Sequence, residues 1–171
     1  MSTIPELAPF IDLATRPDVV EQFGVEPGWR FAMVRHARFA DLDALAHLNH
    51  TTYLRYFEDA RLQYLVHHGL EGLRRGGKDT PSPVLLGLEI RYLKPAFHGD
   101  AVLATVRTAK IGNTSMSLDY AAWTTGCAAT CTSPFVLMNA GTGEKVTVPD
   151  DMRKSISDFE PDGLNGSPTA G

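Results

Sequence analysis

The sequence has few cysteines and no long apolar run. Cys127 and Cys131 are the only cysteines among 171 residues, and no stretch approaches the length needed to span a membrane. The N-terminal region lacks the basic start and apolar core of a secretion signal. We therefore place the protein in the cytoplasm, away from the membrane, and interpret the two thiols as small buried side chains rather than a redox or metal pair.

An excess of basic residues is also missing. The chain has 16 Lys and Arg against 20 Asp and Glu, a net charge of −4, so it offers no general attraction for nucleic acid. Any anionic ligand must therefore be held locally. The composition, 43% apolar and 21% charged, is that of an ordinary domain with room for one sizeable core.

The pattern along the chain predicts an arm, one domain and a tail. Residues 1–28 contain several prolines and no sustained period, so we expect an N-terminal arm that packs onto a domain at residues 29–157. Residues 158–171 are rich in Gly, Pro and Ser, and we expect a disordered tail there.

Within the domain, the periodicity predicts an α+β fold. Apolar residues at helical spacing predict a helix over residues 51–70, which Asn49 or Thr51 can cap and Gly69 can end. Strands are expected at 29–39, 84–93, 101–111, 115–125 and 128–139, and a short helix at 149–159. Short separators make the strands antiparallel neighbours. One helix on a five-stranded sheet leaves edges exposed, so we expect a homodimer, possibly assembled into a tetramer.

The residues with chemical potential gather between the first strand and the long helix. Asp41, Asp43, His47, Asn49 and His50 lie within ten residues, next to a helix N-terminus whose unpaired N–H groups can bind developing negative charge. A carboxylate that faces such an oxyanion site is an arrangement of hydrolases.

The segment RFADLDALAHLNHTTYLRYFEDAR, residues 38–61, resembles the hotdog thioesterases of the 4-hydroxybenzoyl-CoA thioesterase type. Their pattern is D-x-D, then G-H-V-N-N, then Y-L-x-Y-F-E-x-A-R. The resemblance continues through the following strands and covers about residues 29–156. It implies a hotdog fold, in which a five-stranded antiparallel sheet wraps a long central helix, and hydrolysis of an acyl-CoA thioester without a cofactor.

The resemblance also implies roles for individual residues. Asp43 matches the catalytic carboxylate, which acts either as general base on water or as nucleophile. The backbone N–H of His50 matches the oxyanion donor. Two residues depart from the family pattern, since Ala46 replaces a Gly and His50 replaces an Asn. We interpret them as a change of specificity, with strain in the loop if position 46 has a positive φ.

Other polar residues near this segment have alternative interpretations. His47 either packs in the loop or serves the pocket, and His47 and His50 are both candidates for a second catalytic residue. Asn49 is expected to cap the helix, and Asp41 to be exposed or to stabilise a turn. Glu58, three residues before Arg61 and able to pair with it, is the alternative catalytic carboxylate. No metal-ligand spacing is present.

The substrate side is less defined. Tyr53 and Phe57 favour an apolar tunnel for the acyl group. The candidates for contact with CoA are Arg74, Arg75, Lys110 and Thr114. The turn at residues 112–114 has no charge, which leaves an acyl-carrier-protein thioester as an alternative to CoA. A non-catalytic acyl-thioester binding protein and a hotdog dehydratase or hydratase remain alternative functions.

Overall fold

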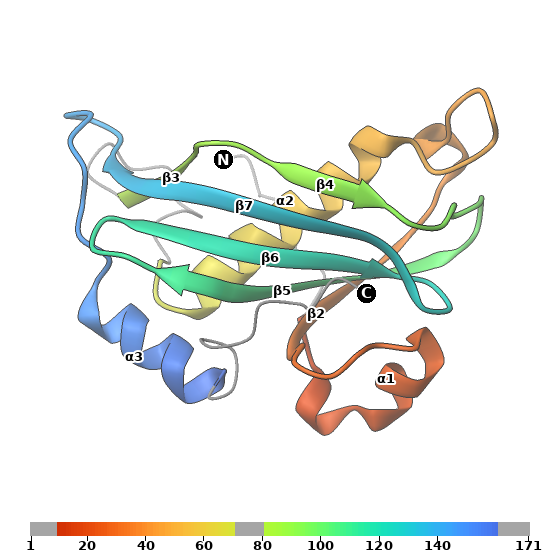
Figure 1. Cartoon of the computed structure of the whole chain (residues 1–171), viewed down its shortest axis with the longest axis horizontal. Coiled ribbons are helices and arrows are strands. Elements are labelled where there is room, and N and C mark those ends of the chain that lie inside the picture. The colour runs from red at the N-terminus through yellow and green to blue at the C-terminus, as the bar shows by residue number, and fades with distance from the viewer. Residues whose placement is uncertain (1–9, 71–80, 161–171) are drawn as a thin grey trace, which may run out of the picture.

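The computed structural model describes residues 10–70 and 81–160, which form one antiparallel sheet with helices against both faces (Figure 1). In chain order the elements are β1 (Ile11–Asp12), η1 (Leu13–Thr15), α1 (Pro17–Phe23), β2 (Phe31–His36), η2 (Phe39–Asp41), α2 (His50–His67), β3 (Pro81–Leu85), β4 (Glu89–Tyr92), β5 (Ala101–Ile111), β6 (Ser115–Trp123), β7 (Cys127–Asn139) and α3 (Asp150–Phe159). The strand order is β1-β2-β5-β6-β7-β3, with β4 also paired to β7. The α+β class and the antiparallel pairing are as predicted.

The sheet has seven strands, so the predicted number of five is wrong. The segment predicted as one strand over 84–93 is divided into β3 and β4, which both pair with β7. The break between β3 and β4 lies opposite Pro134 of β7. Pro134 has no N–H to donate to a ladder, and its carbonyl accepts one hydrogen bond from the Leu86 N–H at 2.9 Å. The seventh strand, β1, comes from the N-terminal arm and pairs with β2.

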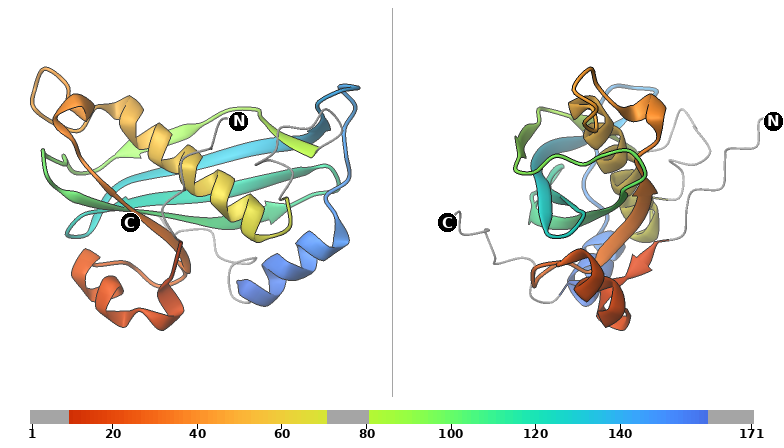
Figure 2. Two further views of the ribbon diagram at one scale, coloured as in Figure 1. Left: turned by 180° about the vertical axis from the view of Figure 1, so that it is seen from behind. Right: turned by 90° about the vertical axis from the view of Figure 1, so that its right-hand side faces the viewer.

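Helix α2 lies across the face of the sheet that curls around it (Figure 2). Asn49 is its N-cap, as predicted, and it accepts a hydrogen bond from the Thr51 N–H. Tyr53, Phe57 and Tyr64 are buried against the sheet. Ala60 is completely buried, and its small side chain allows the helix to approach the strands closely.

Apolar arm residues from Ile11 to Val25 cover the opposite face of the sheet, whereas Phe10 packs on the α2 side. Alternate residues of β5 divide between two apolar clusters, because successive side chains of a strand point to opposite faces. Val102 and Val106 face α2, whereas Leu103 joins Val19 and Phe23 of α1 in the second cluster. Both faces of β5 are therefore covered.

The predicted tail starts at residue 158, which lies inside α3, and residues 161–171 lie outside the described residues.

Both cysteines are free thiols, with Cys131 buried and Cys127 half-buried. No helix in the described part of the chain is long and apolar enough to span a membrane.

Candidate active site

A small hairpin leads from β2 into α2 and carries Asp43. Leu42 and Leu48 form an antiparallel bridge, and the Asp43 N–H donates to the His47 carbonyl at 2.8 Å. Residues 44–46 connect Asp43 and His47, and the last of the three, Ala46, has a φ of +59°. A three-residue hairpin loop favours a left-handed residue at its end, usually Gly. Ala46 holds that conformation at a cost of about 1–2 kcal/mol, so the loop is strained as the sequence suggested.

Asp41 anchors the start of this hairpin. It is 2% exposed and forms ion pairs with Arg38 and Arg55, both at 2.9 Å. The hydrogen bond from Arg38 holds the pKa of Asp41 below its usual value. The Asn49 N–H donates to the Asp41 carbonyl at 2.8 Å, which brings the end of the hairpin back to its beginning. Asp41 therefore stabilises a turn, as predicted, but it is buried rather than exposed.

The carboxylate of Asp43 has two oxygens in different situations. Oδ1 accepts the N–H groups of Leu45 at 2.8 Å and His47 at 3.2 Å, and so closes the hairpin. No hydrogen bond formed within the described residues involves Oδ2. The residue is half-buried. One oxygen thus fixes the loop, and the other is free to take a proton or to attack a carbonyl carbon.

The N-terminus of α2 follows directly. The Asn49 side chain accepts the Thr51 N–H at 2.9 Å, and its carbonyl accepts the Thr52 N–H at 2.8 Å. The N–H of His50, the first helical residue, has no acceptor among the described residues. His50 is exposed, and its carbonyl accepts the Tyr92 hydroxyl at 3.2 Å. An unpaired N–H at a helix N-terminus is suited to stabilise an oxyanion.

Aromatic side chains surround this end of the helix. The His47 ring meets Phe97 edge-on at 5.3 Å between centroids, so His47 packs in the loop while remaining half-exposed. Tyr53 is 2% exposed and its ring lies 5.6 Å from that of Tyr92. Burial raises the pKa of Tyr53 to about 12. The sequence did not single out Tyr92 or Phe97, whose only signal was an aromatic residue at each end of the turn after β4.

Glu58 lies farther along α2, beside a pocket of about 130 Å³. Its side chain is 59% exposed and pairs with Arg61 at 3.2 Å, as predicted. Phe57 also lines this pocket, and its ring contacts Tyr120 at 5.3 Å between centroids. Neither Asp43 nor His50 is among the lining residues.

The predicted CoA contacts lie elsewhere. Arg74 and Arg75 fall outside the described residues. Lys110 and Thr114 are at the end of β5 and in the following turn, whereas Ala101 at the start of β5 pairs with His36 next to the Asp43 hairpin. Eleven residues of strand span about 35 Å, so neither residue can meet a thioester held at Asp43 of the same chain.

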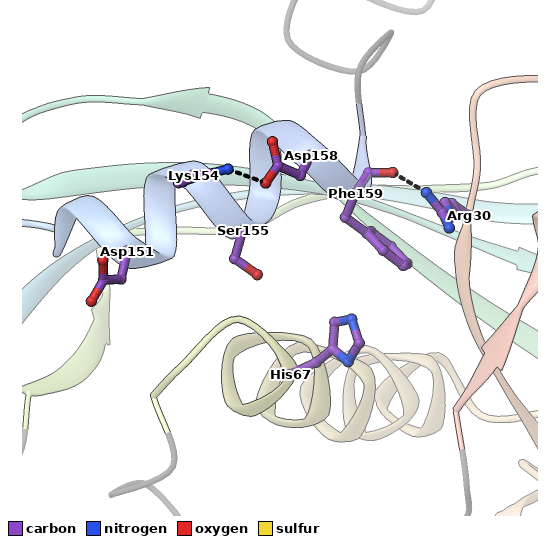
Figure 3. Close-up of a pocket in the computed structure, with 7 residues that line it drawn as sticks. All are labelled: Arg30, His67, Asp151, Lys154, Ser155, Asp158 and Phe159. Carbon is purple, nitrogen blue, oxygen red and sulfur yellow. Dashed lines mark hydrogen bonds and ion pairs between the residues drawn. The ribbon is translucent and has the colours of Figure 1, made fainter.

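A larger pocket, of about 480 Å³, lies at the other end of α2, between His67 and α3 (Figure 3). Its two cations, Arg30 and Lys154, are already paired. Lys154 binds Asp158 at 2.6 Å, and Arg30 binds the Phe159 carbonyl at 2.7 Å and a carboxylate of β1. We therefore do not place the active site there. Among residues 10–70 and 81–160, no group of three metal-ligand side chains comes together.

Comparison with known proteins fits this geometry. Residues 37–156 match the model of the thioesterase-like superfamily. A thioesterase-superfamily structure from Jannaschia sp. CCS1 has 25% identity and a TM-score of 0.80, covering 96% of this chain and 100% of that one. A thioesterase from Thermus thermophilus, complexed with coenzyme A and Zn, has 28% identity and a TM-score of 0.71, covering 81% and 100%.

A 1,4-dihydroxy-2-naphthoyl-CoA thioesterase from Synechocystis shares the fold at 18% identity, with a TM-score of 0.65 and coverage of 75% and 96%. A search of curated proteins finds no significant match. The family match covers the Asp43 hairpin, all of α2 and the strands from β3 to β7, so with its hotdog-like fold this chain belongs to the thioesterase-like superfamily.

Proposed function

We propose that the protein hydrolyses acyl-CoA thioesters, with Asp43 as the catalytic carboxylate and the His50 N–H as oxyanion donor. One observation carries this proposal. The hairpin presents a carboxylate oxygen of Asp43 that has no partner, and the helix that directly follows the hairpin begins with an unpaired N–H at His50. Hydrolysis needs both a base or nucleophile and a site for the carbonyl oxygen. The thioesterases among the similar structures support the same reaction class.

Either role of Asp43 yields the same products. As a base, Oδ2 takes a proton from water, the hydroxide adds to the carbonyl carbon, and the C–S bond breaks to release thiol and acid. As a nucleophile, Oδ2 attacks the carbonyl carbon, the C–S bond breaks to release the thiolate, and water then hydrolyses the resulting anhydride to the acid and free Asp43. In both routes the negative charge on the carbonyl oxygen is stabilised by the His50 N–H.

Two cations lie near this site. Arg38 and Arg55 share the single carboxylate of Asp41, and their side chains are 72% and 56% exposed. The cluster therefore keeps one uncompensated positive charge at the surface. We propose that it attracts the phosphates of CoA. Lys110 and Thr114 remain candidates only if a second chain brings them to the site.

We expect a second copy of the chain to cover the exposed apolar residues around the site. Phe39, Leu45 and Phe97 are exposed beside the Asp43 hairpin, and more exposed apolar residues follow the free edge of β3 and β4. Those edge residues are Val84, Leu85, Leu86, Leu88, Tyr92 and Leu93. Such a row at an unpaired sheet edge is typical of an interface. We propose a homodimer in which this edge is buried.

The proposal is tested by thiol release from a panel of short, long and aromatic acyl-CoAs, with matched acyl-carrier-protein thioesters in parallel. Hydrolysis of at least one acyl-CoA well above the rate without protein supports the function. Turnover of carrier-protein thioesters alone would overturn the assignment of CoA. Tight acyl-CoA binding without turnover would instead indicate a non-catalytic binding protein.

A further inference from the structure

The pocket beside Glu58 has apolar walls and a polar inner end. Leu54 and Phe57 of α2 form one wall, and Leu85 and Leu88 from the free edge of the sheet form the other. The remaining lining residues are Arg55, Glu58, Arg61 and Tyr120. Arg61 and Tyr120 are 7% and 1% exposed, so the polar groups at the inner end are well removed from water.

Two polar atoms of buried lining residues have no hydrogen-bond partner in the described residues. They are Nε of Arg61 and the Tyr120 hydroxyl; a third such atom, the hydroxyl of Ser133, belongs to a residue near Tyr120 that does not line the pocket. Burial raises the pKa of Tyr120 to about 12, and the nearby Arg61 charge and Ser133 hydroxyl oppose that rise without forming a well-oriented hydrogen bond. Buried polar groups without partners are unusual, and a ligand is one way to satisfy them.

The pocket lies on the same stripe of α2 as the proposed oxyanion donor. His50, Leu54, Phe57 and Arg61 follow one another at intervals of three or four residues, which places them on one face of the helix. The helix rises about 16 Å from His50 to Arg61, at about 1.5 Å per residue. An acyl chain whose thioester carbonyl meets the helix N-terminus can therefore extend along this face toward Arg61.

We infer that the pocket selects an acyl group carrying a hydroxyl oxygen remote from the thioester, held by Arg61 and Tyr120. This inference rests on the proposed thioesterase function and adds the substrate class. The apolar walls suit the methylene chain, and the inner end supplies an N–H donor and a hydroxyl for one oxygen. Since Glu58 already pairs with Arg61, the site favours a neutral hydroxyl over a second carboxylate.

The test compares dodecanoyl-CoA, whose extended chain is about as long as the rise from His50 to Arg61, with ω-hydroxydodecanoyl-CoA and with the ω-carboxy analogue of equal length. For each, kcat/KM is measured for hydrolysis, and Kd is measured for the non-hydrolysable thioether analogue. The variant is Tyr120→Phe, which removes only the hydroxyl. Because that hydroxyl has no partner in the free protein, its loss should leave the fold intact.

We expect the wild type to prefer the ω-hydroxy substrate over the plain one by about tenfold, in kcat/KM and in Kd, and the ratio between the two substrates to fall close to one in Tyr120→Phe. Equal affinity of the wild type for the plain and ω-hydroxy analogues would overturn the inference, as would a preference for the ω-carboxy analogue. Selective binding without hydrolysis would support the pocket and refute the thioesterase, so the two claims fail separately.

Discussion

Glu160, directly after α3, predicts a pH dependence of stability. Its side chain is 6% exposed, and Oε2 accepts hydrogen bonds from the Thr108 N–H and the Tyr64 hydroxyl, both at 3.0 Å. The other oxygen, Oε1, has no partner in the described residues. Burial, only partly offset by these hydrogen bonds and by the Arg107 and Arg30 cations, raises the pKa of Glu160 to about 7.

The direction of this pH dependence follows from the number of protons that the folded and unfolded states bind. Between the ordinary value of 4.5 and about 7, the unfolded chain has an ionised Glu160 while the folded chain keeps it protonated. The folded state then binds more protons, so its stability falls as pH rises through this window. At about 1.4 kcal/mol per pH unit, the loss is about 3 kcal/mol.

His68, at the end of α2, acts in the opposite direction. It is 1% exposed, and its Nδ1 lies 2.9 Å from the Ser155 hydroxyl. Burial, with a smaller contribution from the His67 charge, lowers the pKa of His68 from 6.5 to about 3. Here the unfolded state binds the extra proton between those values, so stability is lost as pH falls below 6.5. Between pH 4.5 and 6.5 the two groups nearly cancel in the wild type.

The prediction is tested by urea unfolding of the wild type, Glu160→Gln and His68→Asn from pH 4.5 to 7.5. Relative to Glu160→Gln, the wild type should lose about 3 kcal/mol of unfolding free energy across this range. With His68→Asn the stability should fall more steeply with rising pH than in the wild type, because the opposing effect of His68 is removed while that of Glu160 remains. Taking differences between variants removes the contribution of all other groups. A difference between wild type and Glu160→Gln that does not change with pH would refute the reasoning.

Two further predictions concern the hairpin and the sheet edge. Ala46→Gly relieves about 1–2 kcal/mol of left-handed strain and costs about 0.4–1 kcal/mol of chain entropy, so urea unfolding should show a gain of about 0.5–1 kcal/mol. Ala44→Gly in the same loop should destabilise, and a similar effect of both would contradict the strain. Leu86→Glu, at a side chain 63% exposed, should weaken the homodimer at least tenfold in sedimentation equilibrium, whereas Thr142→Glu should not. A wild-type monomer would refute the proposed interface.

The strongly periodic segments were predictable from the sequence. Strand β5 matches the predicted 101–111, and α3 and α2 differ from the predictions by only a few residues. Their patterns are local, because the spacing of apolar residues fixes which face is buried. Asn49 as the cap of α2 was predictable for the same reason, since capping depends on neighbours in sequence.

Features that depend on distant partners were not predictable. The arm forms α1 because the second face of the sheet covers Val19 and Phe23. The burial of His68 was not predictable either, because α3, which packs over it, lies far away in the sequence. The polar end of the pocket beside Glu58 combines Arg61 of α2 with Tyr120 of β6, two elements whose approach no local pattern encodes. For the Asp43 hairpin, the sequence indicated the residues, while the division of roles between Oδ1 and Oδ2 required the structure.

The central claim is that Asp43, rather than Glu58, is the catalytic carboxylate. Asp43→Asn retains an oxygen that can accept the Leu45 and His47 N–H groups, so the hairpin should persist while the free base or nucleophile is lost. The decisive measurement is kcat/KM for thiol release from the best acyl-CoA by the wild type, Asp43→Asn and Glu58→Gln. The account predicts a fall of at least about a hundredfold for Asp43→Asn and at most a few-fold change for Glu58→Gln. Full activity in Asp43→Asn, with loss in Glu58→Gln, would contradict it.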